Sequence, residues 1–176
     1  MVIRRTALRV ALVGAVAAIG WWVYRQARPP ILTASVGEIA VEWSGRYRGR
    51  AVLPATLNWC PGTRLGILQG ISTDTGVSIV VYETEALTRG RHAVVSPTLL
   101  PAVPRPSATA AIRWARDSAV LVGFRSVSGV VQLQLVGTTV SGTLDALMQV
   151  PASSDTLVVK GSFDRVPVTT TAIGCT

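Results

Sequence analysis

From residue 38 onward, hydrophobic and polar side chains alternate in short runs, which is the pattern of β-strands with one buried face. In the first run, Ile39, Val41 and Trp43 share a face. The later runs cover residues 64–72, 77–85, 92–96, 108–115, 119–127, 130–136, 139–148 and 156–164. Turn-forming residues separate most of them, at 73–76, 88–90, 116–118, 128–129 and 151–155. The pattern predicts an all-β domain, an antiparallel sandwich or barrel of about 8–9 short strands.

The amino-terminal residues follow a different pattern, because residues 10–24 carry no charge and are mostly apolar. A helix of this length covers about 22 Å, which is shorter than a hydrocarbon core of about 30 Å. Long arginine side chains that snorkel and aromatic rings at the headgroup level make up the difference. We therefore predict one transmembrane signal-anchor helix within residues 1–28. Its interfacial residues are Arg9, Trp21, Trp22, Tyr24 and Arg25.

A cleaved secretory signal is the alternative interpretation of this segment. Arg4, Arg5 and Arg9 would form its basic region, and the Ala-Val-Ala of residues 15–17 would be its cleavage site. Only residues 10–14 would then form the apolar stretch, which is shorter than the roughly seven residues that such a region needs. The residues therefore favour an uncleaved anchor.

The two cysteines and the arginines indicate the compartment. Cys60 and Cys175 are far apart and lack the spacing of a metal or redox motif, which suits one structural disulfide, with two buried free thiols as the alternative. Arginines are slightly more numerous before the apolar segment than after it, which favours an amino terminus inside the cell. We expect a single-pass protein of the bacterial inner membrane, cytoplasmic or intracytoplasmic, with its carboxy-terminal domain in the periplasm.

The length of 176 residues allows one ordinary domain plus a short extra segment. We divide the chain into the anchor (1–28), a proline-containing linker (29–37) and the β domain (38–176). Within the domain, residues 97–106 carry four prolines and apolar side chains but no strand pattern. The segment is either a stiff crossover between two sheets or a contact loop for a partner protein. The contact residues would be Leu99, Leu100, Pro101, Val103 and Pro104.

The net charge of +8 suggests nucleic-acid binding until it is divided along the chain. Five of the seventeen basic residues precede residue 29, which leaves twelve basic against nine acidic residues and a net charge of +3 for the remainder. Acidic and basic residues are interspersed there, unlike the clustered basic surface that phosphate neutralisation requires. We therefore expect no nucleic-acid partner.

Catalytic signals are few. Asp74-Thr75-Gly76 resembles the active-site triplet of retropepsin-like aspartic proteases, which would make Asp74 catalytic, but Ser72 and Thr73 replace the usual apolar pair. A hairpin turn explains the triplet equally well. The single histidine, His92, has too few companions for a metal site and is expected to be a half-exposed strand residue.

Other polar and aromatic residues have ordinary structural explanations. Glu83 and Glu85 are expected on the solvent face of one strand. Trp43, Trp59 and Trp114 are expected in the core, although they could instead line a ligand site. We expect no cofactor and no enzymatic activity.

The layout as a whole is similar to the membrane-extrinsic accessory subunits that hold photosynthetic reaction centres inside light-harvesting rings in some phototrophic bacteria. The resemblance covers a tryptophan-ended anchor, a periplasmic β domain and a proline-rich loop. It implies a structural role, in which the chain contacts integral membrane subunits and the bilayer while other chains bind the pigments. Trp21 and Trp22 would lie near pigment or lipid, although the interface explains them without either. The alternatives are the protease and a ligand-binding envelope sensor.

Overall fold

The computed structural model describes residues 33–99, 103–116, 120–151, 153–170 and 175, without the side chain of residue 99. The predicted anchor and residues 29–32 of the linker lie outside these residues. Within the described part, the chain forms nine strands and one short 3-10 helix. The elements are β1 (Glu38–Gly45), β2 (Gly49–Cys60), β3 (Leu65–Ile71), β4 (Thr75–Tyr82), β5 (Gly90–Val95), η1 (Pro97–Leu99), β6 (Ser107–Ala115), β7 (Leu121–Val136), β8 (Thr139–Gln149) and β9 (Thr156–Thr169).

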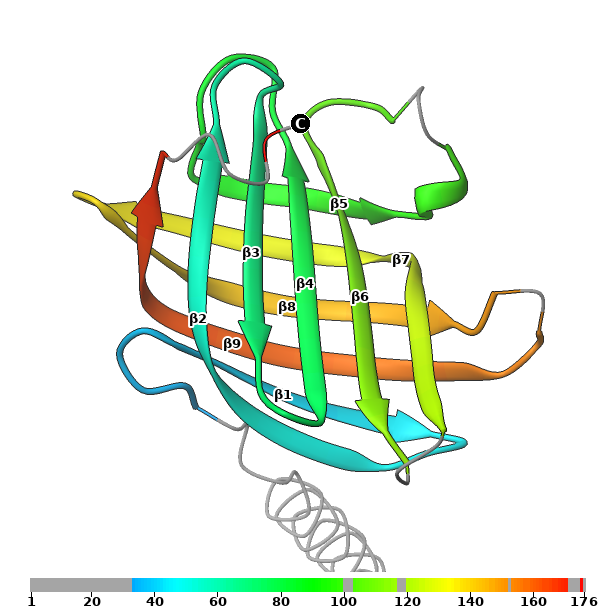
Figure 1. Ribbon diagram of the computed structural model, residues 1–176. Coiled ribbons are helices and arrows are strands. Elements are labelled where there is room, and N and C mark those ends of the chain that lie inside the picture. The colour runs from blue at the N-terminus through cyan, green and yellow to red at the C-terminus, as the bar shows by residue number, and fades with distance from the viewer. Residues whose placement is uncertain (1–32, 100–102, 117–119, 152, 171–174, 176) are drawn as a thin grey trace, which may run out of the picture. The chain divides into compact units, whose positions relative to one another are not determined.

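The strands close into a barrel in the order β1-β2-β3-β4-β6-β5-β7-β8-β9. Figure 1 shows β2, β3, β4 and β6 in front of β5, β7, β8 and β9, with the strands of the two layers crossing at a steep angle. The all-β prediction is confirmed, and of the two architectures expected the barrel is observed. The sheet is mixed, because β5 pairs with β6 and β2 with β9 in short parallel ladders.

Two expectations for individual strands were wrong. The sequence pattern gave no strand over residues 49–60, yet β2 occupies this range and pairs with both β1 and β3. Its Pro54 lies opposite Glu38, at the start of β1, so the missing N–H interrupts the ladder only where it ends. Residues 128–129 form no turn, because β7 runs through them with a register shift between Ser126 and Ser128.

The register shift explains why the sequence pattern predicts two separate strands, 119–127 and 130–136, where the structure has the single strand β7. Gly129 adopts a φ of +140°, and a Cβ added there would lie 2.2 Å from the carbonyl oxygen of Asp145 on β8. A glycine is therefore required where β7 bends across its neighbour. This bend lets one long strand pair with β5, β6 and β8.

The barrel interior is filled with side chains from alternate strand positions. The buried set includes Ile39, Leu57, Leu68, Ile79, Ile112, Phe124, Leu133, Leu144 and Met148. Trp43 stacks on Trp114 with ring centroids 5.0 Å apart, and Trp114 stacks on Phe124 at 5.6 Å. Trp43 is buried, and Trp59 and Trp114 are partly buried against the core. The expectation that these tryptophans anchor the core is therefore confirmed.

Candidate functional site

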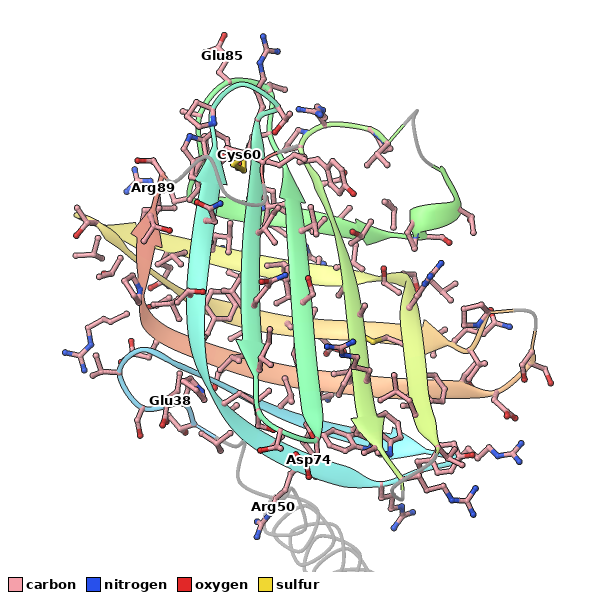
Figure 2. All side chains as sticks on the ribbon, in the orientation of Figure 1. Glu38, Arg50, Cys60, Asp74, Glu85 and Arg89 are labelled. Atoms are coloured by element: carbon pink, nitrogen blue, oxygen red, sulfur yellow. A yellow bond between two sulfur atoms is a disulfide. The ribbon has the colours of Figure 1, made fainter. Side chains whose placement is uncertain are left out.

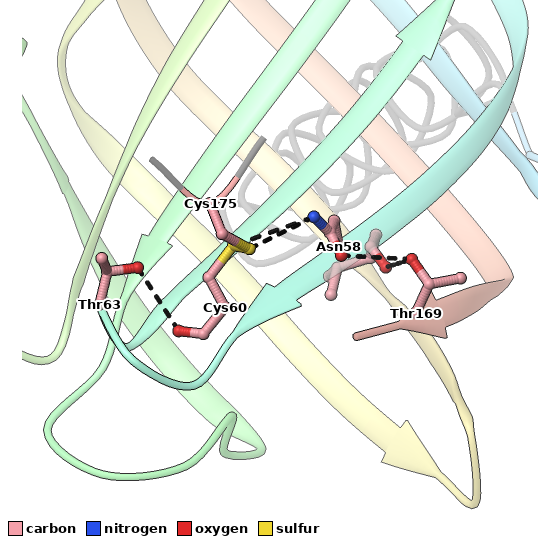
Figure 3. The surroundings of a disulfide bond; sticks show 6 residues. Asn58, Cys60, Thr63, Thr169 and Cys175 are labelled. Atoms are coloured by element: carbon pink, nitrogen blue, oxygen red, sulfur yellow. Dashed lines mark hydrogen bonds between the residues drawn. A yellow bond between two sulfur atoms is a disulfide. The ribbon is translucent and has the colours of Figure 1, made fainter. Parts of the chain in front are cut away.

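Figure 2 shows Cys60, Glu85 and Arg89 at one end of the barrel and Asp74 at the opposite end. We call the first end the clamp end and define it by Cys60, Glu83, His92, Arg105 and Cys175. Cys60 at the end of β2 forms the predicted disulfide with Cys175, with the two Cα atoms 5.4 Å apart and a sequence separation of 115. Asn58 donates a hydrogen bond to the Cys175 sulfur at 3.5 Å (Figure 3). The carboxy terminus is therefore tied to the barrel.

The clamp end also contains a buried acid–base pair. The Glu83 carboxylate lies 2.8 Å from Nε2 of His92, and each residue is only 1% exposed. The Thr88 backbone N–H and hydroxyl both donate to the same carboxylate oxygen at 2.9 Å. Glu83 thus ties the connection between β4 and β5 to the barrel interior.

These positions correct two expectations. His92 is buried rather than half-exposed, because it points inward from β5 beside a carboxylate partner. Glu83 follows the last residue of β4 and turns inward, whereas Glu85 is exposed, so the two glutamates do not share a solvent face. Nδ1 of His92 is buried and has no hydrogen-bond partner among the residues that the structure describes.

Arg105 fastens the end of the proline-rich segment to this end of the barrel. Its guanidinium donates to the carbonyl of Glu83 at 2.7 Å and to that of Thr63 at 3.2 Å. It also lies 5.9 Å from the centre of the Tyr82 ring. Glu83, His92 and Arg105 therefore each have a hydrogen-bond partner within the chain, and these contacts stabilise the fold.

A cavity of about 490 Å³ lies on the outer face of β3, β4, β6 and β7. We call it the outer groove. Its floor carries the small residues Gly76, Ser78, Ala111 and Gly123, and two arginines also line it, Arg113 between Gly76 and Gly123, and Arg125 beside Ala111. Ile71 and Leu121 border it and are 54% and 63% exposed, respectively. Small side chains on a convex sheet leave a depression, so the alternation of small and large residues creates the groove.

The strand register sets the spacing of the two arginines. Arg113 on β6 lies opposite Gly76 on β4 and Gly123 on β7, and Arg125 on β7 lies opposite Ala111 on β6. Arg113 and Arg125 are therefore diagonal neighbours, whose Cα atoms are about 7–8 Å apart in an antiparallel pair. A Cβ placed on Gly76 would lie 3.2 Å from Nε of Arg113, so the arginine side chain extends over this glycine.

The charges of the outer groove are uncompensated. Both arginines are exposed, and neither forms a hydrogen bond or ion pair with any residue in the described part of the chain. Among the residues that the structure describes, no Asp or Glu lines the groove. Desolvating an arginine requires an acceptor, so a ligand that covers this face must supply one.

A second cavity of about 490 Å³ continues the outer groove, because both are lined by Arg125 and Pro151. We call it the hydroxyl cavity, since Ser96, Thr98 and Ser154 line it together with Gln149. It contains no acidic residue either. Asp155, next to it in sequence, is paired with Arg46 at 2.6 Å, and this carboxylate raises the pKa of the arginine. The described lining of the two cavities is thus cationic or neutral.

The structure places the predicted contact loop only in part. Leu100 and Pro101 lie outside the described residues, as does the side chain of Leu99. Val103 is buried at 9% exposure, and Pro104 is exposed and accepts a hydrogen bond from the Ser107 hydroxyl. Part of the loop therefore folds back on the barrel, and contact through Val103 would first require the loop to move.

The predicted interfacial residues Arg9, Trp21, Trp22, Tyr24 and Arg25 lie outside the described residues. From residue 33 onward, excluding the gaps given above, no helix has the length and hydropathy needed to cross a membrane.

Asp74 lies in the exposed turn between β3 and β4. Its carboxylate accepts a hydrogen bond from the Ser72 hydroxyl at 2.9 Å, and its carbonyl accepts one from the Ala115 N–H at 2.7 Å. Both bonds are those of a hairpin turn that contacts the neighbouring strand. Among the described residues, no cluster of three or more His, Cys, Asp or Glu side chains could hold a metal ion.

Sequence reasoning missed the outer groove. Its floor comes from β4, β6 and β7, which become neighbours only because β5 crosses to the far side of β6. The available signal was the succession of small residues at alternate positions, Gly76 and Ser78 on one strand and Ala111 on another. That signal has meaning only when the strand order is known.

We compared the chain with models of protein families, with curated protein sequences and with solved structures, and none of them matches it.

Proposed function

We propose that this chain is a non-catalytic accessory subunit that is tethered to a membrane and docks through its outer groove to a larger membrane protein complex in the periplasm. The observation that carries the proposal is the groove itself, a concave surface whose two arginines have no partner, and whose lining has no acidic side chain, among the described residues. Such a surface is suited to a partner with complementary charge.

The distribution of polar groups supports docking over catalysis. The buried pair of Glu83 and His92 is enclosed, and Asp74 is engaged in its own turn. The arginines of the groove offer charge and hydrogen-bond donors, which position a partner, and among its described lining residues no His, Asp or Glu stands beside them as a general base. These residues suit recognition.

The sequence supplies the tether. The apolar residues 10–24 would confine the barrel to the surface of one membrane, where its effective concentration toward other membrane proteins is high. A groove of modest size is then sufficient for assembly. The specific partner that we propose, from the resemblance in layout, is a photosynthetic reaction-centre and light-harvesting complex, with its pigments bound by other chains.

Co-purification from native membranes tests this proposal. In mild detergent, the full chain should be recovered at fixed stoichiometry with integral membrane subunits. Gly123→Val should abolish this recovery, because a side chain would fill the groove floor. Arg91→Gln is the matched control, since Arg91 is an exposed strand arginine outside the groove. Recovery of the complex with Gly123→Val at the wild-type level would contradict the proposal.

A further inference from the structure

We propose that the outer groove binds an extended acidic segment of the partner protein, in which an apolar residue is followed by two acidic residues at alternate positions. This inference rests on the docking function proposed above and adds the chemistry of the occupant.

The spacing of the outward-facing residues in the groove matches that of an extended chain. Leu121, Gly123 and Arg125 are alternate residues of β7 that face outward, and Arg113 lies beside Gly123. The groove therefore presents Leu121 and Arg125 along β7 and, on β6, Arg113, which is a diagonal neighbour of both and whose side chain extends away from β7 over Gly76. Alternate residues of an extended chain are about 6.6–6.8 Å apart, which matches this series. A segment lying along β7 would place each of its same-face side chains against one of these three groups.

The positive charge of the two arginines favours an acidic segment. Arg113 and Arg125 have no acceptor in the described part of the chain, and neither cavity contributes an acidic side chain. A guanidinium binds a carboxylate through two parallel hydrogen bonds, so two carboxylates would satisfy both arginines. Basic or neutral segments would leave the arginines desolvated without a partner.

The groove floor and the adjoining hydroxyl cavity are suited to an extended main chain. Gly123 lets a main chain approach the sheet closely, because this position presents no side chain and an added Cβ would have no neighbour nearer than 3.9 Å, whereas the Arg113 side chain covers Gly76. Beyond Arg125, the hydroxyls of Ser96 and Ser154 and the amide of Gln149 line the continuation of the groove. The Ser96 hydroxyl is hydrogen-bonded to Thr98 and the Gln149 amide nitrogen donates to the Ser153 carbonyl, so the Ser154 hydroxyl and the Gln149 amide oxygen are the groups that would bond to the peptide groups of an extended polypeptide.

The experiment measures binding of labelled, capped peptides to the full chain in detergent by fluorescence anisotropy. The first peptide has the core Leu-Ser-Glu-Ser-Glu, and the second has the same composition in the order Leu-Glu-Glu-Ser-Ser, which puts adjacent acids on opposite faces. A third replaces both Glu by Gln. We expect the first peptide to bind at least about tenfold more tightly than the others, and less tightly at high ionic strength.

Variants locate the site. Arg113→Gln and Arg125→Gln should each weaken binding of the first peptide by about tenfold, whereas Arg91→Gln should leave it unchanged. Gly123→Val should abolish it. Equal affinity for the two glutamate peptides, or equal effects of the three arginine substitutions, would overturn the inference.

Two further outcomes separate this inference from the docking function and from a lipid ligand. If no peptide binds but Gly123→Val still abolishes recovery of the membrane complex, the acidic segment is wrong and the docking function stands. If the peptide binds as expected but recovery of the complex is unaffected by Gly123→Val, the docking function is wrong. Tighter binding of monomeric short-chain phosphatidylglycerol than of the first peptide, lost in both groove arginine variants, would assign the groove to lipid and overturn the inference.

Discussion

The clamp end and the outer groove differ in whether their charged side chains have hydrogen-bond partners within the chain. At the clamp end, Glu83 pairs with His92, and Arg105 donates to two backbone carbonyls. In the outer groove, Arg113 and Arg125 have no partner among the described residues. An internally satisfied group holds the chain together, whereas unsatisfied groups gathered in a depression are available to another molecule. The comparison therefore separates residues that stabilise the barrel from residues that we assign to recognition.

The largest expected effect is at the clamp end. Replacing both Cys60 and Cys175 by serine releases a loop with a sequence separation of 115. The free energy of unfolding should fall by about 4 kcal/mol, since the unfolded chain regains the entropy that the cross-link removes. Urea denaturation of the full chain in detergent measures this change. A loss below about 1 kcal/mol would show that the disulfide contributes little and would weaken the contrast between the regions.

The buried pair at the clamp end should come next. His92→Leu leaves the Glu83 carboxylate without its imidazole partner, so the free energy of unfolding should fall by about 3 kcal/mol. Glu83→Gln should cost less, because the amide oxygen still accepts the two hydrogen bonds from Thr88. The exposed pair of Arg165 and Asp164 is the control, and Arg165→Gln should change stability by less than about 0.5 kcal/mol. Equal losses in His92→Leu and Arg165→Gln would contradict this ranking.

Two glycines of β7 provide a matched comparison between fold and groove. At Gly123 an added Cβ would be 3.9 Å from its nearest neighbour, so Gly123→Val should leave stability unchanged or raise it by about 0.5 kcal/mol. At Gly129 the same substitution meets the Asp145 carbonyl and a φ of +140°. Gly129→Val should therefore destabilise the barrel by about 2 kcal/mol or more. Thermal unfolding distinguishes the two, and similar losses would show that the groove floor is structural.

The smallest effect should come from Asp164, which lies in neither region. The Arg165 guanidinium, followed by the Ser141 hydroxyl, donates hydrogen bonds to its carboxylate and lowers its pKa. A lowered pKa in the folded state means that the contribution to stability is present above the unfolded pKa of about 3.9 and is lost as pH falls through the folded value. Asp164→Asn should remove this small acid dependence from the urea midpoint. An unchanged pH profile in the variant would contradict the assignment.

The strands could be predicted from the sequence because inward positions are apolar and outward positions polar along most of the chain. The same rule failed at Pro54, which hides β2, and at Gly129, where a bend inside β7 has the composition of a turn. Both failures arise because proline and glycine occur in turns and also at the ends and bends of strands. Which of these forms depends on the pairing with neighbouring strands, which the sequence pattern does not show.

The site was much less predictable than the fold. His92 and Glu83 are nine positions apart, and only the path of the β4–β5 connection shows that they meet in the interior. Arg113 and Arg125 become neighbours through the pairing of β6 with β7. Gly76 lies next to Arg113 through the pairing of β4 with β6. Sequence patterns identify the face of each strand but not the order of strands, and the outer groove depends on that order.

The most direct test of the central claim uses the double substitution Arg113→Gln and Arg125→Gln in the full chain. Its urea midpoint and its recovery with membrane partners are measured on the same preparation. We predict a free energy of unfolding within about 0.5 kcal/mol of wild type, because exposed unpaired arginines contribute little to folding, together with loss of the partners. A destabilised barrel, or partners recovered at the wild-type level, would contradict it.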